Sequence, residues 1–359
     1  MTPRFLAILT VRNEAAFLLD WLAWHRHVGF TDFLVFSNDC EDGTDRMLDR
    51  LQAMGWLTHV PNPGPHPEGA QWAALKQAGQ HPLRQAADWV MVFDIDEYVT
   101  IHAGDGTLGA LMGLFPQATA FPLTWRLFGN AGITNYEDRP LPEIFTRAAP
   151  AVMGWPWRAA MFKTLFRDDG SYGKLGVHRP RQPDPARIAA QHWVDGSGRT
   201  LPAVYHTTKL YSPFGRDNYA IAQLNHYALG AAESYLLKTD RGRANRSSSA
   251  FDLSYWVERN LCAVEDRRLA DRFAAAHNLR DSLAGDQELA GLHQAAVQWR
   301  RDRFARLMAD DSYRSLFGRL LMAPPSRLLS AAESERILSY ANAAQSAQQG
   351  ASGSDPETE

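Results

Sequence analysis

The sequence has few of the features that define several common protein classes. Cys40 and Cys262 are its only cysteines, which excludes a disulfide framework and a cysteine zinc cluster and fits a reducing compartment. No apolar run approaches the roughly 18 residues that a membrane helix needs. The apolar run at residues 5–9 is too short for a signal-peptide core, and no small-residue cleavage site follows it. We expect a cytoplasmic protein, with peripheral contact at the inner face of a membrane left open.

An excess of positive charge is also missing. The chain has 37 Lys and Arg against 40 Asp and Glu, a formal net charge of −3, so no basic field indicates nucleic acid as a partner. Neither a Gly-x-Gly-x-x-Gly fingerprint nor a P-loop occurs. With 45% hydrophobic and 21% charged residues, the composition is that of an ordinary globular protein. Its 359 residues suffice for an α/β domain with an additional region.

Strand and helix patterns alternate over the first 95 residues or so. Asn13 is expected to cap the first helix, Gly29 to end it and Pro82 to end the third. Strands are expected at residues 5–11, 33–36, 56–60 and 89–93, and helices at residues 14–28, 42–55 and 70–81. This alternation predicts right-handed βαβ units, and therefore an α/β fold with a mostly parallel sheet flanked by helices.

The rest of the chain is less regular. Residues 116–211 combine short apolar pieces with loops rich in Gly, Pro and Trp, which suits a pocket for a second substrate. Residues 212–237 are predicted to be helical, residues 241–249 to be a linker and residues 253–308 to be helical again. Ser330 and Glu333 form a plausible capping box for a last helix. We expect a main domain at 1–245, a helical C-terminal region at 246–342 and a disordered tail at 343–359.

The most informative segment ends the fourth predicted strand. The apolar run at residues 89–93 leads directly into Asp94 and Asp96, with Glu97 beside them. Open α/β sheets bind ligands just beyond the carboxyl ends of their strands. Carboxylate oxygens on a rigid strand end suit Mg²⁺ or Mn²⁺ that is shared with substrate phosphates. The segment predicts a divalent metal site; the plain alternative is a strand end with solvated carboxylates.

Several patches together resemble one enzyme class. They are residues 8–14, residues 36–44, residues 93–98, and residues 176–180 and 225–227 followed by Lys238 and Arg241. The chain resembles the GT-A glycosyltransferases and, more narrowly, a bacterial family-2-like branch related to family 92. The resemblance covers about residues 4–245 and leaves out the helical C-terminal third. It implies a Rossmann-like GT-A catalytic domain that transfers a hexose from a nucleotide diphosphate sugar, expected to be a UDP-sugar. The acceptor would be a saccharide or glycan, as in polysaccharide biosynthesis, and the transfer would invert the anomeric centre.

The resemblance also implies a metal set. Asp94 and Asp96 would hold Mn²⁺ or Mg²⁺ against the diphosphate, with Asp96 as the main catalytic ligand. A third ligand is expected from His226 or His178, although a lone His in aromatic surroundings is more often a packed core residue.

The nucleotide is expected at the ends of the first two strands. Similar enzymes imply that Val11, Asn13 and Glu14 line the base and that Asp39 contacts uracil or ribose. Lys76 could reach a phosphate, but it also suits a solvated helix face, just as Asn13 suits a helix cap.

Inverting transfer needs a general base near the acceptor hydroxyl. Glu143 resembles a family Glu near a short strand, and Asp138, Asp195 and Asp217 are its rivals. Trp125 is either a stacking platform for the acceptor or a core residue. Four cations that could neutralise the diphosphate, or lie on the surface, are Lys163, Arg179, Lys238 and Arg241.

Other classes fit less well. A phosphatase of the haloacid-dehalogenase type also has Asp-x-Asp after a strand, but it prefers Thr or Val where Tyr98 stands, and here three predicted strands precede the motif. A nucleotidyltransferase would need a Gly-rich phosphate loop at the first strand. A non-catalytic nucleotide-sugar-binding or scaffold protein would not require the intact pair of Asp94 and Asp96.

Overall fold

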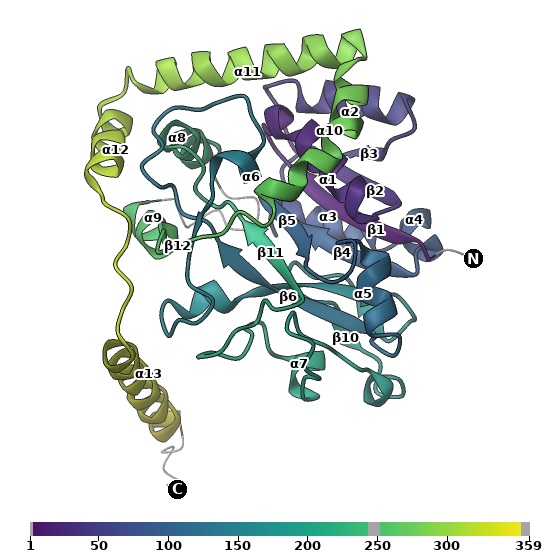
Figure 1. The fold of residues 1–359 in the computed structure, drawn as a ribbon, viewed down its shortest axis with the longest axis vertical. Coiled ribbons are helices and arrows are strands. Elements are labelled where there is room, and N and C mark those ends of the chain that lie inside the picture. Colours follow the sequence, from purple (N-terminus) through teal and green to yellow (C-terminus); the bar gives the residue numbers. More distant parts are fainter. Residues whose placement is uncertain (1–2, 243–251, 353–359) are drawn as a thin grey trace, which may run out of the picture.

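The computed structural model describes residues 3–242 and 252–352, so most of the linker expected at 241–249 lies outside the described residues. One eight-stranded sheet forms the centre of the molecule (Figure 1). Its order is β3 (Thr58–Pro61), β2 (Asp32–Ser37), β1 (Phe5–Val11), β4 (Trp89–Phe93), β8 (Phe162–Arg167), β6 (Ala120–Leu127), β11 (Ala222–His226) and β5 (Glu97–Ile101). The strands from β3 to β4 are parallel, and antiparallel pairings of β8 and β5 extend the sheet. This arrangement confirms the expected α/β fold with a largely parallel sheet.

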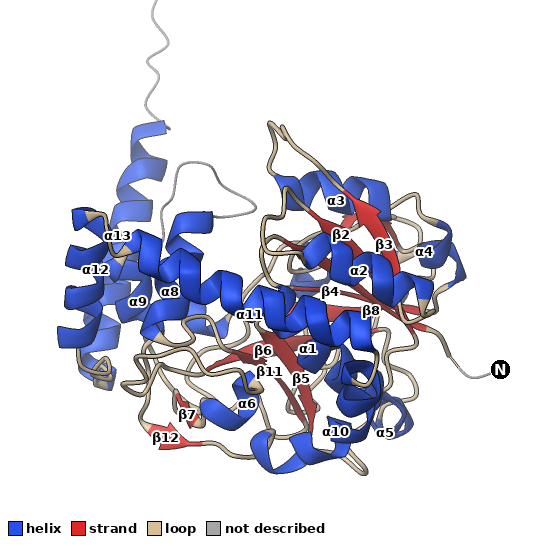
Figure 2. Ribbon diagram, turned by 90° about the horizontal axis from the view of Figure 1, so that it is seen from above, coloured by secondary structure: helices blue, strands red, loops and turns tan. Residues whose placement is uncertain are grey.

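Helices cover both faces of the sheet. In β1, Ala7 and Leu9 join the core beneath α1 (Ala15–Val28) and α2 (Thr44–Ala53), whereas Leu6 and Ile8 join a second core with α3 (Ala70–Ala78). Alternate residues of a strand point to opposite faces, so a continuous apolar run is what a strand covered on both sides requires. Figure 2 shows α1 and α2 on one side of the sheet.

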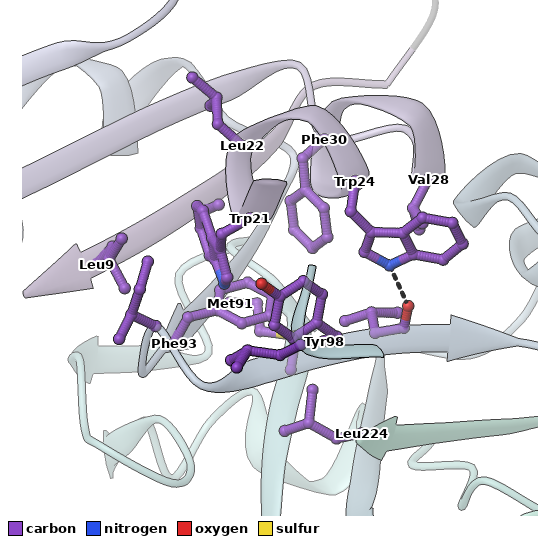
Figure 3. Packing of buried hydrophobic residues seen from close by; sticks show 14 of the residues in the cluster. Leu9, Trp21, Leu22, Trp24, Val28, Phe30, Met91, Phe93, Tyr98 and Leu224 are labelled. Carbon is purple, nitrogen blue, oxygen red and sulfur yellow. Dashed lines mark hydrogen bonds between the residues drawn. The ribbon is translucent and has the colours of Figure 1, made fainter. Parts of the chain in front are cut away.

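Helix α1 is tied to the strand that follows the acidic pair. The indole N–H groups of Trp21 and Trp24 donate to the carbonyl oxygens of Glu97 and Val99, at 3.0 and 2.8 Å. Figure 3 shows the bond of Trp24. The imidazole of His25 is fully buried beside them, with its ring 4.7 Å from the ring of Phe93. These contacts fix the turn that joins β4 to β5, and Asp94 and Asp96 lie in that turn.

The start of α1 differs from the sequence prediction. Asn13 has a positive φ of 55° and does not cap the helix. Instead, Asp42 Oδ2 accepts from the N–H of Ala15 and Thr44 Oγ1 accepts from the N–H of Glu14, at 3.0 and 2.9 Å. The prediction was wrong because residues at the start of α2 satisfy the free N–H groups of the helix.

The helix predicted at residues 212–237 is also wrong. Residues 222–226 form β11 between β6 and β5, and only α8 (Ala232–Arg241) is helical at the end of this segment. A short run that is buried on both faces has no periodicity that separates a strand from a helix. Strand β5, which the sequence analysis did not predict, pairs with β11. Pro82 opens the short helix α4 (Pro82–Ala86) as its first residue rather than ending the segment.

Shorter elements complete the region between β5 and α8. They are α5 (Leu108–Leu114), α6 (Leu141–Ile144), β7 (Arg147–Ala148), a 3₁₀ turn at Trp157–Ala160, β9 (Tyr172–Lys174), β10 (Arg181–Pro183), a 3₁₀ turn at Ile188–Ala190 and α7 (Val204–Thr207).

The C-terminal region is helical, as predicted, and packs on the sheet domain. Its elements are α9 (Leu253–Arg259), β12 (Val264–Glu265), α10 (Ala270–Ala284), α11 (Gln287–Leu307), α12 (Asp311–Met322) and α13 (Ala331–Ser352). The ring of Phe273 stacks on Trp24 of α1 at 5.5 Å, and Arg280 pairs with Asp20.

Helix α13 stands away from the sheet (Figure 1). The predicted capping box is confirmed, because Ser330 Oγ accepts from the N–H of Glu333 and Glu333 Oε2 accepts from the N–H of Ser330. The helix continues to Ser352, into the segment that we expected to be disordered, and residues 353–359 lie outside the described residues. None of the helices in the described ranges combines the length and hydropathy that crossing a membrane requires.

Candidate active site

A cleft of about 570 Å³ lies at the carboxyl ends of β1, β2 and β4. Three groups of residues line it. The first group follows β1, β2 and β3 in the chain and has Val11, Arg12, Asn38, Asp39 and residues 64–71; the second follows β4 and has Asp94, Ile95 and Asp96; the third comes from later in the chain and has Trp125, Val177, His178, His226, Lys238, Arg241, Tyr255 and Arg259. The structure therefore brings the acidic pair and both candidate histidines into one cavity, at the place where open α/β sheets bind ligands.

Asp94 is held by a buried lysine. The ammonium of Lys163, on β8, lies 3.0 Å from Asp94 Oδ2, and the amide of Gln71 donates to Asp94 Oδ1 at 3.0 Å. Burial alone would raise the Asp94 pKa, but the charge of Lys163 outweighs it, so the pKa is lowered. Lys163 itself is fully buried and does not line the cleft. Asp94 is therefore ionised and fixed in position.

Asp96 has a second lysine as its partner. Lys238 Nζ, on α8, lies 2.6 Å from Asp96 Oδ2, and His226 Nε2 lies 3.7 Å from Asp96 Oδ1. Burial opposes ionisation, but Lys238 and then His226 hold the Asp96 pKa far below its usual range. The main-chain N–H of Tyr227 donates to the Asp96 carbonyl at 2.9 Å, which ties the turn to the end of β11.

Glu97 contacts the acidic pair of Asp94 and Asp96 from the interior of the domain. Its carboxylate is fully buried and accepts from the Trp125 indole at 2.7 Å and from the Asp94 N–H at 2.9 Å. Lys163 Nζ lies 3.2 Å from Glu97 Oε2. Burial raises the Glu97 pKa to about 8, although Lys163 works against the shift. The sequence placed Glu97 beside the pair, but only the fold shows that Trp125 and Lys163 are its partners.

The two histidines flank the Trp125 ring. Ring centroids lie 4.3 Å apart for His226 and 5.5 Å apart for His178. His178 Nδ1 donates to the Phe162 carbonyl at 3.0 Å, which leaves its Nε2 as an acceptor. Burial lowers the pKa of His226 to about 3 and that of His178 to about 4. Both imidazoles are therefore neutral near pH 7, which is the state that can ligate a metal.

The side chains around Asp96 could supply some, but not all, of the ligands of a divalent cation. Among residues 3–242 and 252–352, no group of three or more His, Cys, Asp or Glu side chains is arranged to hold a metal ion. Asp96 Oδ1 and His226 Nε2 face each other across 3.7 Å, and His226 Nδ1 is buried without a partner. One carboxylate and one imidazole suit an ion that takes its remaining ligands from substrate phosphate and water. Asp94 and His178 line the same cleft.

Most of the residues predicted to contact the nucleotide lie together. Val11 and Asp39 line the cleft; Asn38 donates to the Val11 carbonyl from its backbone and side chain, at 2.9 and 3.0 Å. Asp39, with a positive φ of 45°, accepts from the N–H of Gly64 at 3.2 Å. Glu14 lines the cleft and pairs with Arg241.

Two of the predicted nucleotide contacts lie elsewhere. The Asn13 carboxamide accepts from the N–H of Glu41 at 2.7 Å, and Asn13 lines a smaller neighbouring cavity rather than the cleft. Lys76 is exposed on α3 and is not part of the cleft lining.

The candidate general bases do not reach the cleft. Glu143, on α6, accepts from His277 Nε2 at 2.8 Å, and Asp138 lies 2.9 Å from His293 Nε2. Asp195 is bound to Arg199, and neither it nor Asp217 lines the cleft. The structure thus keeps these four carboxylates apart from Asp94 and Asp96.

Sequence reasoning missed two cations. Arg12 and Arg259 line the cleft with Lys238 and Arg241, and the Nε atoms of both arginines are buried without an acceptor. The adjacency of Arg12 to Asn13 and Glu14 was the available signal. Arg179, by contrast, is not part of the lining.

The acidic pair at the end of β4 is joined by His226 from β11 and by lysines from β8 and α8, in agreement with the GT-A resemblance of the sequence. The chain belongs to glycosyltransferase family 92, because the model of that family matches residues 8–195. A family 92 protein of Ricinus communis is 28% identical over 104 residues, which are 27% of this chain and 17% of that protein. One of Oryza sativa subsp. japonica is 27% identical over 144 residues, 38% of this chain and 23% of that protein. The matched segments span about a fifth of the length of these relatives.

Solved structures show more distant likeness. The S. aureus TarS fragment 1–349 in complex with UDP-GlcNAc has a TM-score of 0.30 and 13% identity, covering 79% of this chain and 74% of that one. Glucosyl-3-phosphoglycerate synthase from Mycobacterium tuberculosis, in complex with Mn²⁺, UDP and glucosyl-3-phosphoglycerate, has a TM-score of 0.23 and 18% identity, covering 34% and 44%.

Proposed function

We propose that the protein is a metal-dependent glycosyltransferase that moves a hexose from a nucleoside diphosphate sugar, expected to be a UDP-sugar, to a saccharide or glycan acceptor with inversion. The observation that carries the proposal is the juxtaposition of Asp96, His226 and Lys238 in the cleft at the strand ends. Membership of family 92 supports glycosyl transfer as the chemistry. The low cysteine content fits action in the cytoplasm, including at the inner face of a membrane.

Each part of the cleft has a role in this proposal. Val11, Asn38 and Asp39 would receive the nucleoside, because they stand at the ends of β1 and β2. Asp96 and His226, with Asp94 beside them, would hold Mn²⁺ or Mg²⁺, which when bound supplies positive charge to a leaving diphosphate.

Protein cations support the same step. Lys238, Arg241, Arg12 and Arg259 lie along the cleft and would contact the phosphate oxygens as the glycosidic bond to the donor breaks. Lys163 and Glu97 keep Asp94 in place from inside the domain, so the acidic pair does not need to reorganise during the reaction.

A thermal-shift titration tests the donor. UDP, GDP and CDP are each added with and without Mn²⁺, and we expect UDP to raise the melting temperature only when the metal is present. Metal-dependent hydrolysis of UDP-hexoses would then identify the sugar. Stabilisation by none of the nucleotides would contradict the proposal and favour a phosphatase or a binding protein.

The variant Asp96→Asn tests the role of Asp96 in the proposed metal site. It removes one negative charge with little change in shape, so we expect turnover to fall by about 100-fold or more while the folded structure is retained. Activity assays and circular dichroism measure the two effects. Turnover at the wild-type level would remove Asp96 from the metal site.

A further inference from the structure

A second, smaller cavity of about 60 Å³ adjoins the cleft, between α1, α8 and α11. Glu14, Asp96, Lys238 and Arg241 line both cavities and form the wall between them. On the far side the small cavity is lined by Arg300 and, beside it, Phe17, Leu141, Ser234 and Trp299. We call this cavity the rear chamber.

Arg300 enters the rear chamber from α11 and is only 5% exposed. Its guanidinium carbon lies 4.6 Å from the Phe17 ring and 4.7 Å from the Tyr136 ring. Its one hydrogen bond among the described residues goes from Nη2 to Ser234 Oγ at 3.0 Å, and its Nε is buried without an acceptor. No carboxylate in the described part of the chain forms an ion pair with Arg300.

Such a charge is costly to keep. A buried cation without an ion-pair partner loses hydration that aromatic contacts replace only in part; the charges of Asp42 and Glu233 act on Arg300, but neither carboxylate is within ion-pair distance of it. Burial lowers the Arg300 pKa, but a guanidinium remains protonated near neutral pH. The side chain therefore has four N–H groups beyond the one bonded to Ser234, in a position that favours an anion.

The carboxylates of the rear chamber do not supply that anion. Glu14 pairs with Arg241, Asp96 lies 2.6 Å from Lys238, and Asp240 lies 2.8 Å from Arg303. Each of these acids thus has its own cation, which for Asp240 is Arg303 from outside the lining, and Arg300 is the lining cation that has no carboxylate partner among the described residues.

We propose that the rear chamber binds a phosphate or carboxylate group, with Arg300 as its charged contact and the Ser234 hydroxyl as a second donor. A single water needs about 10–15 Å³ of such space, so a cavity of about 60 Å³ accepts the three or four atoms of a small oxyanion group. Arginine presents paired N–H groups that match the oxygens of either group.

The position of the chamber indicates which substrate carries the anion. Lys238, Arg241, Arg12 and Arg259 already face the main cleft, where the donor diphosphate is proposed to bind. The chamber lies on the other side of the Asp96–Lys238 pair, so its anion belongs to the second substrate. This step rests on the proposed function: the acceptor would be an anionic saccharide that places its charged group against Arg300.

The test is a calorimetric titration of the full chain with inorganic phosphate and, separately, with acetate, each with and without saturating UDP and Mn²⁺. We expect one of the two anions to bind under both conditions, and its identity separates a phosphorylated from a carboxylated acceptor. Arg300→Met should weaken that binding at least about tenfold, a factor that corresponds to one arginine contact of ~1.4 kcal/mol. Arg306→Met, on the exposed side of the same helix, should leave it unchanged.

Three outcomes overturn the inference: neither anion binds the wild type, Arg300→Met binds equally well, or UDP abolishes anion binding, which would place the anion in the donor site. If Arg300→Met does not fold, Ser234→Ala and Arg300→Lys provide the same comparison, with weaker binding expected for both. The UDP titration reports separately on the proposed function. Anion binding that depends on Arg300 in a protein that ignores UDP would leave the chamber as an anion site and contradict only the glycosyltransferase proposal.

Discussion

Lys238 Nζ lies 2.6 Å from Asp96 Oδ2. The ammonium group thus contacts the carboxylate that is expected to bind a metal ion. Lys163 Nζ likewise lies 3.0 Å from Asp94 Oδ2. Both carboxylates are thereby neutralised before any ligand arrives. A divalent cation that binds Asp96 has to compete with Lys238, and the displaced ammonium is then free to contact a phosphate oxygen.

Replacing Lys238 by Met should therefore strengthen metal binding in the absence of nucleotide. We expect about tenfold tighter Mn²⁺ binding to Lys238→Met, because a competing charge worth ~1.4 kcal/mol is removed from Asp96. UDP binding should weaken in the same variant. Calorimetry or the paramagnetic resonance of free Mn²⁺ measures the change. Arg241→Met is the control, since it removes an equal charge whose partner is Glu14; weaker Mn²⁺ binding to Lys238→Met would refute the competition.

The two histidines differ in the partners of their ring nitrogens. His226 Nε2 lies 3.7 Å from Asp96 Oδ1, whereas His178 is held to the Phe162 carbonyl. We expect His226→Ala to weaken Mn²⁺ binding by about 10- to 100-fold and His178→Ala to have a smaller effect. A Mn²⁺ titration of both variants provides the measurement. An unchanged titration for His226→Ala would assign the remaining ligands to His178 or water.

Lys163 should matter for folding as much as for the site. Lys163→Met leaves the Asp94 and Glu97 carboxylates without their shared cation, and breaking such a buried pair costs about 3–5 kcal/mol. Glu97→Gln in the same chain removes one of the two carboxylates and should recover part of the loss. Urea denaturation of the wild type, both single variants and the double variant completes a mutant cycle, and it is done at pH 9, above the Glu97 pKa of about 8, so that Glu97 is ionised. Additive losses would show that Lys163 and Glu97 do not interact energetically.

His25 should make the fold sensitive to acid. Its Nδ1 donates to the Trp21 carbonyl at 2.8 Å and its Nε2 accepts from the N–H of Val99 at 3.3 Å, so only the neutral ring satisfies both contacts. Burial lowers its pKa to about 3, below the unfolded value of about 6.5. Its contribution is therefore complete above pH 6.5 and is lost as the pH falls towards 3.

The loss amounts to about 1.4 kcal/mol of unfolding free energy per pH unit in that window. Urea denaturation between pH 7 and pH 5 measures this slope. His25→Gln should be less stable at pH 7, but its unfolding free energy should depend less steeply on pH, because one titrating group has been removed. Parallel slopes for the wild type and this variant would show that the imidazole is already accessible to protons in the folded state.

Local patterns predicted the part of the fold that local contacts determine. Strands β1 and β4, helix α1 and the position of Asp94 and Asp96 all follow from apolar runs and turn residues close in sequence. Lys163 could not be predicted as a partner of Asp94, because the antiparallel register of β8 against β4 joins residues about 70 positions apart. Arg300 reaches the rear chamber from a helix outside every recognised motif, and no sequence signal connects it with Ser234.

Strand β11 and helix α10 lie outside the residues that match the family, yet the fold requires both of them. The family match ends at residue 195, yet β11 fills the place between β6 and β5, and α10 covers Trp24 with Phe273. A fragment limited to the matched residues would leave β5 without a neighbour in the sheet and expose an aromatic face of α1. The unit that folds is therefore longer than the unit by which the family is recognised, and residues outside the motifs stabilise the strand end on which the acidic pair lies.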